Sequence, residues 1–328
     1  MVTIWWCVLG LLTCGYFALA GYDYGVGMLL PGFEADERKR RQTLGALGPF
    51  FLANEVWLVA AVGLLFGAFP HLEGKVFAGA YVLVVTLLLG LVTFTASMQL
   101  RSRRPNARRG AWTAGIVGGA LVTALSWGLF LGNLLVGLPL RADGSPSGDV
   151  LALFTPYAVL WGLGFVALFC LQGALFLAVR APAELTGRAV RLARAFSAPV
   201  LAFLVIATVW GAFALDGVTV LGIVVTVLAF AAFAVARLGL AARRHRLALV
   251  GSMVLAACPA LLVGTLRFPA VLVSPGYTMS VDQAATAPGT LAVLGWFAPP
   301  SVLLLLVVQW LTWRAHRHPV DQRSLLHF

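Results

Sequence analysis

The sequence predicts an all-α, polytopic membrane protein with nine transmembrane helices. Of its 328 residues, 61% are hydrophobic and only 11% are charged, which is more apolar surface than a water-soluble domain of this size can bury. The apolar segments run for about twenty residues, the length of helix that crosses a bilayer core. They lack the polar–apolar alternation of membrane β-strands. Helices are therefore the expected spanning elements.

Nine apolar segments have the required length, and short connections that contain polar residues, glycine or proline separate them. The shortest connection lies at Asp216 and Gly217, between the sixth and seventh spans. No small-residue cleavage motif follows the first span, so we expect that span to be retained. The predicted spans are Ile4–Tyr22, Pro49–Phe69, Val76–Met98, Trp112–Val136, Pro156–Val179, Phe196–Leu215, Val218–Val235, Leu247–Val273 and Gly289–Trp313.

The basic residues predict the orientation of the chain. Of the 23 Lys and Arg residues, 20 lie in the connections after spans one, three, five and seven or in the C-terminal tail; the opposite side holds only Lys75, Arg141 and Arg267. Cytoplasmic connections are enriched in Lys and Arg, so we expect the N-terminus outside and the C-terminus in the cytoplasm. The net charge of +11 thus reflects topology and attraction to anionic lipids. A nucleic-acid partner would instead require these residues on one folded surface.

Two acids fall within the spans or against their ends. Asp23 follows the first predicted span in GYDYGVGMLLP, where glycines allow close helix approach, and Glu55 follows Asn54 inside the second span. An ionised carboxylate at bilayer depth costs about 2.5 to 3.5 kcal/mol. For Asp23, pairing with the basic cluster Arg38–Arg41 and proton handling remain equal alternatives. For Glu55 we favour proton handling over a packing role in which Arg or Asn holds the acid.

Histidine and cysteine placement indicates no cofactor or metal site in this chain. All four cysteines lie in apolar spans without a C-x-x-C pair, as expected of small buried hydrophobic residues. All five histidines lie in connections or in the tail, whereas haem in a membrane bundle is usually held by histidines within helices. No phosphate-binding or dinucleotide-binding motif has the required context.

Several motifs occur in order along the chain. They are GYDYGVGMLLP, RRQTLGALGPFFLANEVWL with LFGAFP, GNLLVGLPL, TPY followed by LQGALFL, and FPAVLVSPGYTM before the last aromatic span. Each is weak alone, but the series is specific. Over its whole length the sequence resembles subunit II of cytochrome bd-type quinol oxidases.

The resemblance implies a single membrane domain of two four-helix bundles, residues 1–136 and 156–273, with a ninth peripheral helix at 289–313. It implies a partner, the haem-bearing subunit I, which carries haem b and haem d, oxidises quinol and reduces dioxygen to water. Small single-helix subunits often join the complex. Family members of this type bind no haem, brace subunit I, contribute to a cytoplasmic proton route and sometimes hold a structural quinone.

The sequence departs from the family pattern at three places. The family usually reads W-D-G-N-E/Q-V-W, and its acid is Leu52 here, while Glu55 matches the E/Q position. The usual D-G-F-D begins with Ala20 and keeps only its second acid, Asp23. A basic residue that many members carry is absent around Phe94 and Thr95. These departures predict a proton route that is altered in this subunit or carried by subunit I alone.

We therefore interpret the chain as the haem-free subunit II of a bd-type quinol:oxygen oxidoreductase in the bacterial cytoplasmic membrane, with no catalytic residue of its own. Asp23 and Glu55 are the proton-handling candidates, Asn54 is expected to orient Glu55, and Trp57 is expected at the wall against subunit I. One alternative is a proton-coupled secondary transporter, although no pair of short broken helices marks a midplane substrate site. Another is a purely structural subunit in which both acids are paired.

Overall fold

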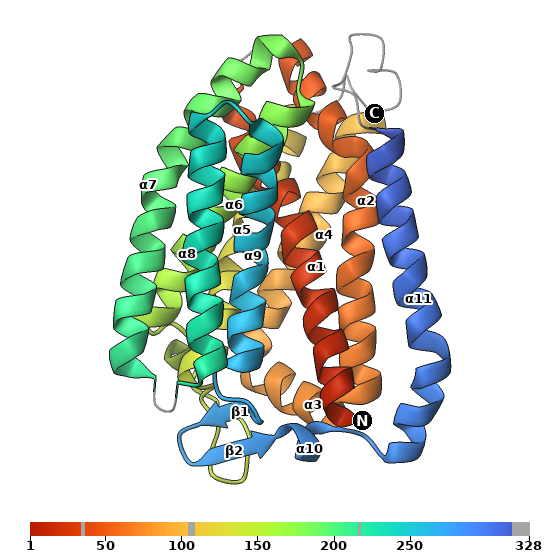
Figure 1. Ribbon diagram of the computed structural model, residues 1–328, viewed down its shortest axis with the longest axis vertical. Coiled ribbons are helices and arrows are strands. Elements are labelled where there is room, and N and C mark those ends of the chain that lie inside the picture. The colour runs from red at the N-terminus through yellow and green to blue at the C-terminus, as the bar shows by residue number, and fades with distance from the viewer. Residues whose placement is uncertain (34–36, 104–108, 216–217, 317–328) are drawn as a thin grey trace.

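The computed structural model describes residues 1–33, 37–103, 109–215 and 218–316. Within these ranges nine helices are long and apolar enough to cross a membrane, which confirms the predicted number (Figure 1). Their bounds are α1 Val2–Leu29, α2 Glu37–Ala68, α4 Tyr81–Arg103, α5 Arg109–Val136, α6 Pro156–Arg180, α7 Ala183–Ala214, α8 Val220–Ala241, α9 His245–Thr265 and α11 Pro288–Ala315. The shorter elements are η1 Leu30–Gly32, α3 Pro70–Gly79, η2 Leu151–Leu153, β1 Ala270–Ser274, β2 Tyr277–Ser280 and α10 Val281–Ala284.

Helix α1 lies at the centre of the molecule. It packs against α2, α5, α6 and α9, while α4 pairs with α5, α6 with α7 and α8 with α9. Helix α11 lies at one edge and packs on α2 (Figure 1). Because α1 contacts α6 and α9 as well as its sequence neighbour, it joins the two halves of the chain. The division into bundles at residues 1–136 and 156–273 stays a prediction.

Two helices begin earlier than the predicted spans. Helix α2 begins at Glu37 rather than Pro49, and α7 begins at Ala183 rather than Phe196, so that Pro49 and Pro199 lie inside helices. The added turns are rich in Arg, Glu, Ala and Leu, which are good helix formers in water as well as in lipid. Hydropathy reports only the part of a helix that lies in the hydrocarbon core, so the span predictions missed these turns.

Two other predicted spans are interrupted. The predicted span Val76–Met98 divides at Ala80 into the short helix α3 and the membrane helix α4. Helix α9 ends at Thr265 instead of Val273, because Pro269 lacks the amide N–H that a continuing helix requires. The β-branched residues that follow form β1, which pairs antiparallel with β2.

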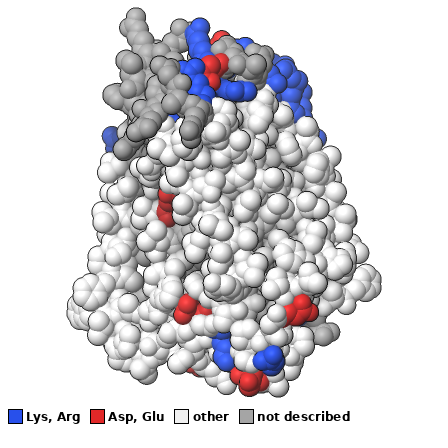
Figure 2. All heavy atoms as spheres, turned by 180° about the vertical axis from the view of Figure 1, so that it is seen from behind, with Lys and Arg blue, Asp and Glu red and all other residues white. Residues whose placement is uncertain are grey.

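The charged groups are concentrated at the two ends of the molecule. Figure 2 shows an uncharged band across the middle of this face, interrupted at one place by an acidic group. The N-terminus and the end of α11 lie at opposite ends of the molecule, with α3 and the β1–β2 hairpin at the N-terminal end (Figure 1). The predicted connection at Asp216 and Gly217 and the tail residues Arg317 and Arg323 lie outside the described residues.

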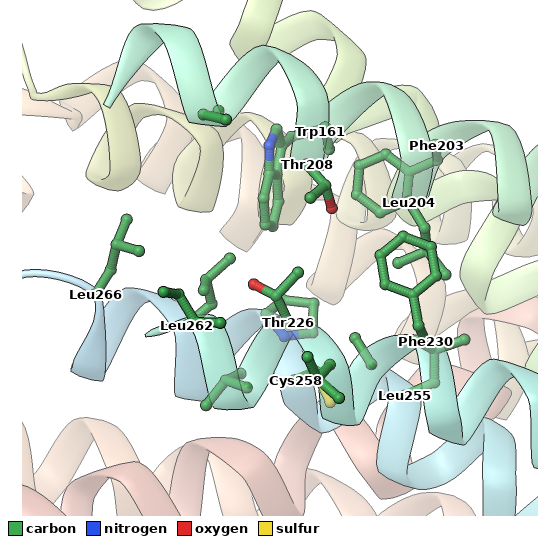
Figure 3. Close-up of a pocket in the computed structure, with 18 of the residues that line it drawn as sticks. Trp161, Phe203, Leu204, Thr208, Thr226, Phe230, Leu255, Cys258, Leu262 and Leu266 are labelled. Carbon is green, nitrogen blue, oxygen red and sulfur yellow. The ribbon is translucent and has the colours of Figure 1, made fainter. Parts of the chain in front are cut away.

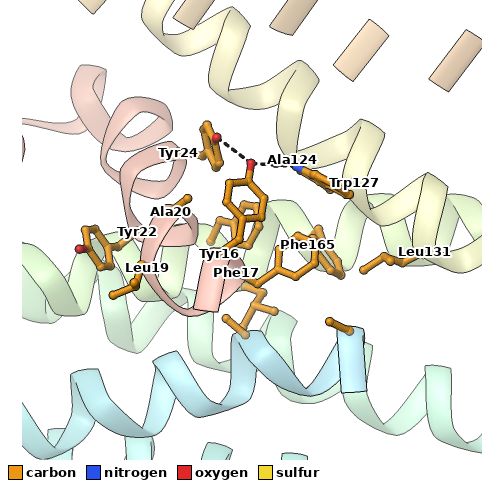
Figure 4. Close-up of a cluster of buried hydrophobic side chains, with 14 of the residues drawn as sticks. Tyr16, Phe17, Leu19, Ala20, Tyr22, Tyr24, Ala124, Trp127, Leu131 and Phe165 are labelled. Atoms are coloured by element: carbon orange, nitrogen blue, oxygen red, sulfur yellow. Dashed lines mark hydrogen bonds between the residues drawn. The ribbon is translucent and has the colours of Figure 1, made fainter. Parts of the chain in front are cut away.

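Aromatic side chains surround the middle of α1 (Figure 4). The Trp127 indole N–H of α5 donates to the Tyr16 hydroxyl at 3.0 Å, and the Tyr16 and Tyr24 hydroxyls lie 2.8 Å apart. Phe17 packs edge-on against Trp127 and Phe165, with ring centroids 5.0 and 5.6 Å away. All five side chains are buried. Helix α1 is therefore held to α5 and α6 by apolar packing, and its tyrosine hydroxyl groups are hydrogen-bonded within the protein.

Glycine allows α1 and α6 to touch backbone to backbone. A Cβ atom at Gly25 would overlap the carbonyl group of Phe169, and one at Gly173 would overlap the backbone of Gly25. Small residues at such positions allow the close approach that stabilises helix pairs in lipid. The predicted use of glycine in this part of the chain is therefore confirmed at Gly25.

We expect Gly25→Ala to destabilise the protein, because α1 and α6 must move apart to accept the methyl group. Overpacking of this kind costs about 1–3 kcal/mol. Gly10→Ala is the matched control, since no heavy atom lies within 4 Å of its added Cβ and the helix gains up to about 1 kcal/mol in propensity. Thermal unfolding in detergent should show a lower Tm for Gly25→Ala alone. Equal Tm values for the two variants would contradict the close contact.

Candidate functional site

The Asp23 carboxylate is enclosed between α1 and α2. Its side chain is 1% exposed, and the Asn54 Nδ2 group of α2 lies 2.9 Å from Oδ2 and 3.2 Å from Oδ1. A carboxylate in an apolar interior needs such hydrogen bonds. Helix α1 continues past Asp23 to Leu29, so the acid is not at the helix end as expected. Its observed partner is Asn54 rather than the cluster Arg38–Arg41.

The same amide group of Asn54 reaches further acceptors on α1. The Tyr22 hydroxyl lies 2.9 Å from Nδ2, and the Leu19 carbonyl oxygen lies 3.4 Å away. Tyr22 is held by its ring, which stacks on Phe176 of α6 with centroids 4.3 Å apart and planes 4° from parallel. Asn54 thus joins Asp23 to Tyr22, and the ring of Tyr22 joins this group to α6.

Helix α11 adds a glutamine to this group. The Gln309 Nε2 group donates to Asn54 Oδ1 at 3.2 Å, and Gln309 Oε1 accepts from the Trp57 indole N–H at 3.4 Å. Gln309 is 8% exposed. Within the described residues, four side chains from α1, α2 and α11 therefore form one continuous chain: Trp57, Gln309, Asn54 and Asp23.

Glu55 lies on a different face of α2. Its Oε1 atom accepts a hydrogen bond from the Thr95 hydroxyl of α4 at 2.7 Å, and the residue is half-buried. Leu52, Val56 and Val59, which flank it on α2, are 55%, 45% and 69% exposed. Glu55 is therefore a carboxylate at the edge of an outward-facing apolar surface.

The expected contact between Asn54 and Glu55 is not formed. Adjacent residues of a helix point in directions about 100° apart and do not face each other. Asn54 consequently points to α1 and α11, while Glu55 points to α4. Asn54 thus hydrogen-bonds Asp23, and the Thr95 hydroxyl hydrogen-bonds and orients the carboxylate of Glu55.

Trp57 also differs from its expected place. We expected it at the wall against a partner subunit, but its side chain is 4% exposed and packs against Gly15 of α1. Its indole N–H is used by Gln309 within the chain. Trp57 is thus an internal contact between α1, α2 and α11.

Sequence analysis missed Gln309 and Thr95. The available signal for Gln309 was an amide within the apolar run LLLLVVQWLTW, because a polar group in a membrane helix needs a partner there. The Thr95 hydroxyl donates a hydrogen bond to the carboxylate of Glu55. Neither partner could be identified from a single helix.

A separate cavity opens between α6, α7, α8 and α9 (Figure 3). Its volume is about 260 Å³, below the ~300–1,000 Å³ of typical ligand sites. Trp161, Phe203 and Phe230 contribute aromatic walls, and the hydroxyl groups of Thr208 and Thr226 contribute polar atoms. The cavity suits a hydrocarbon chain and offers no acid–base chemistry from these groups.

The histidines within the described ranges lie at helix ends. His71 is in the first turn of α3, His245 begins α9 and His316 ends α11. Across those ranges no group of three or more His, Cys, Asp or Glu side chains is arranged to hold a metal ion. His318 and His327 lie outside the described residues.

Comparison with known proteins places this architecture in one family. The profile of the family described as "Cytochrome bd terminal oxidase subunit II" matches residues 1–316. Cytochrome bd-I ubiquinol oxidase subunit 2 of Escherichia coli K12 is 32% identical over 222 residues, which cover 66% of this chain and 59% of the relative. Cytochrome bd ubiquinol oxidase subunit 2 of Bacillus subtilis 168 is 31% identical over 193 residues, or 58% and 57% of the two chains. The matched segment thus spans less than two thirds of each relative.

The fold is also found among solved structures. A chain of the bd oxidase from Geobacillus thermodenitrificans superposes with a TM-score of 0.76 and 19% sequence identity, covering 96% of this chain and 98% of that chain. This similarity shows a shared fold. Because the family profile extends over residues 1–316, the chain belongs to the cytochrome bd terminal oxidase subunit II family and is a multi-pass protein of the bacterial cytoplasmic membrane.

Proposed function

We propose that this chain is the haem-free subunit II of a bd-type quinol:oxygen oxidoreductase, which braces the haem-bearing subunit I and contributes to a cytoplasmic proton route. Family membership and the names of the relatives support the complex. The observation that carries the proton role is the Glu55 carboxylate beside the outward apolar face of α2.

The position of Glu55 supports a protein partner on this face. Exposure of a carboxylate to lipid costs about 2.5 to 3.5 kcal/mol, and one hydroxyl hydrogen bond offsets only part of this cost. A second subunit that covers α2 and α4 would remove the carboxylate from lipid. The exposed side chains Leu52, Leu88 and Val92 would supply the apolar contacts around it.

The resemblance gives this face a further role. The family's usual acid falls at Leu52, which lies one turn before Glu55 on the same outward side of α2. A carboxylate at position 55 can therefore lie at the same subunit interface, about one helical turn further along α2. We assign the exchange of protons at the interface to Glu55, with the Thr95 hydroxyl orienting Oε1.

Asp23 is suited to a supporting role. Its carboxylate is enclosed and receives its hydrogen bonds from a neutral amide, so a proton that binds there is shielded from solvent. We propose that Asp23 holds a proton inside the subunit, whereas Glu55 passes protons toward the partner. Electron transfer to dioxygen takes place at the haems of the partner, and this chain supplies position and protons.

Ligand chemistry supports the haem-free assignment. In the described ranges the histidines lie at helix ends, where they cannot provide paired axial ligands within the bundle. A structural quinone, if held by this chain, would place its tail in the apolar cavity between α6, α7, α8 and α9. The volume of about 260 Å³ accommodates only part of such a molecule.

The basic residues support an orientation with the N-terminus outside. Arg188 and Arg191 lie in the first turns of α7, and Arg243 and Arg244 lie in the connection between α8 and α9; these segments are at the same end as the end of α11 (Figure 1). By the positive-inside rule this end faces the cytoplasm. The β1–β2 hairpin would then face the outside.

Glu55→Gln tests the proton role. The variant keeps the size of the side chain and its acceptor oxygen but cannot release a proton, so we expect quinol oxidase turnover to fall by about tenfold or more. Asp23→Asn should lower turnover less. Glu184→Gln, an exposed acid in the first turn of α7, is the control and should leave turnover unchanged. Unchanged turnover in both Glu55→Gln and Asp23→Asn would contradict the assignment of proton handling to these two acids.

Purification tests the complex and the haem assignment together. The tagged chain should co-purify in mild detergent with a second large membrane subunit and show haem bands in the reduced-minus-oxidised spectrum. The same chain expressed without that partner should be colourless. Haem bands in the isolated chain would contradict the haem-free assignment, and a colourless chain that purifies alone from its native membrane would contradict the oxidase role.

Cysteine labelling tests the orientation. Asp149→Cys, between α5 and α6, should react with a membrane-impermeant maleimide in intact spheroplasts. Glu184→Cys, in the first turn of α7, should react only after permeabilisation. The parent chain reports any background from its own four cysteines. The reverse pattern of labelling would overturn the positive-inside assignment.

A further inference from the structure

We propose that Gln309 of α11 is a positioning residue that determines how Asn54 presents its amide to Asp23. The ninth helix would thereby control the hydrogen bonding of the buried acid. This inference rests on the proposed function only for its effect on turnover. Its structural content follows from the chain of hydrogen bonds that joins Trp57, Gln309, Asn54 and Asp23.

Trp57 determines which atoms of the Gln309 and Asn54 amides donate and which accept. An indole N–H can only donate, so Gln309 must turn its oxygen toward Trp57 and its amino group toward Asn54. Asn54 must then present Oδ1 to Gln309 and Nδ2 to Asp23. Each amide has two orientations in principle, and a donor that cannot reverse its role selects one orientation for both.

The acceptors at the Asp23 end of this series of hydrogen bonds require the same orientation of the Asn54 amide. The Leu19 carbonyl group can only accept, and its oxygen lies 3.4 Å from Asn54 Nδ2. The carboxylate of Asp23 accepts at both oxygens, at 3.2 and 2.9 Å. Both ends thus favour one arrangement, in which the two N–H groups of Asn54 Nδ2 are shared among the oxygens of Leu19, Tyr22 and Asp23. Such a network is more stable than a partly satisfied one.

Helix α11 holds this arrangement at a second point. Trp313 packs against Phe50 with ring centroids 4.7 Å apart and edge-on against Tyr22 at 6.4 Å. Arg180 donates to the carbonyl group of His316 at the end of α11. The helix therefore contacts both residues that adjoin Asp23: Asn54 through Gln309 and Tyr22 through Trp313.

Loss of the Gln309 amide would leave Asn54 Oδ1 without a donor in a buried site. A buried unsatisfied polar group costs about 1–3 kcal/mol, so Asn54 would turn toward other partners. Any such rotation weakens the two contacts from Nδ2 to Asp23. The carboxylate then loses hydrogen bonds that stabilise its charged form, although no residue in contact with it has been changed.

Gln309→Met in the intact oxidase complex tests this coupling, because methionine keeps the length of the side chain and removes its amide. The readout is the infrared difference spectrum on redox cycling, in which Asp23→Asn identifies the bands of Asp23. We expect these bands to shift in Gln309→Met. Gln172→Met is the matched control, since Gln172 is also fully buried and donates to the Ala18 carbonyl of α1. It should leave the Asp23 bands in place.

Turnover separates this inference from the proposed function. Shifted Asp23 bands with lower turnover support both. Shifted bands with unchanged turnover support the positioning role and contradict proton handling by Asp23. Unchanged bands in Gln309→Met overturn the positioning role, whatever happens to turnover.

Trp57→Phe provides a second test that keeps Gln309 and Asn54. Phenylalanine retains much of the packing against Gly15 but lacks the N–H that holds the oxygen of Gln309. We expect the Asp23 bands to broaden, because Gln309 loses one of its two partners and holds Asn54 less firmly. Sharp bands at the wild-type frequency would contradict the role of Trp57. This milder variant also tests the positioning role if the complex that contains Gln309→Met does not assemble.

Discussion

A carboxylate enclosed among apolar helices must receive hydrogen bonds from the protein, and this requirement organises the centre of the molecule. Asp23 of α1 receives them from Asn54 of α2, which in turn accepts a hydrogen bond from Gln309 of α11. Three helices are therefore joined by polar groups in a region where apolar packing alone is not directional. In lipid such hydrogen bonds contribute modestly to stability but strongly to the choice of helix orientation.

Close backbone contact makes this arrangement accessible. Because Gly25 and Gly173 lack side chains, α1 lies directly on α6, and the aromatic residues that precede and follow Asp23 reach across to neighbouring helices. Tyr22 is stacked on Phe176 and also accepts from Asn54. The packing of small residues and the hydrogen bonding of polar residues are thus two aspects of the same contact.

The two membrane acids differ in their surroundings, and this difference suits different roles. Asp23 is enclosed within one chain, whereas Glu55 lies beside exposed apolar residues and bonds Thr95 of α4. An enclosed acid can store a proton, and an acid at a surface can pass one to another subunit. Leu52 stands where the resemblance leads us to expect an acid, and Glu55 keeps a carboxylate beside the outward face of α2.

The sequence by itself determined the number of membrane helices found in the described residues, because about twenty predominantly apolar residues in a row form a helix in lipid. It also singled out Asp23 and Glu55, since acids are rare at bilayer depth. Only the tertiary structure decided their partners. Gln309 and Asn54 are 255 residues apart, and a contact between them depends on how α11 is rotated against α2. That rotation is set by packing between helices, which the periodicity of any single helix does not contain.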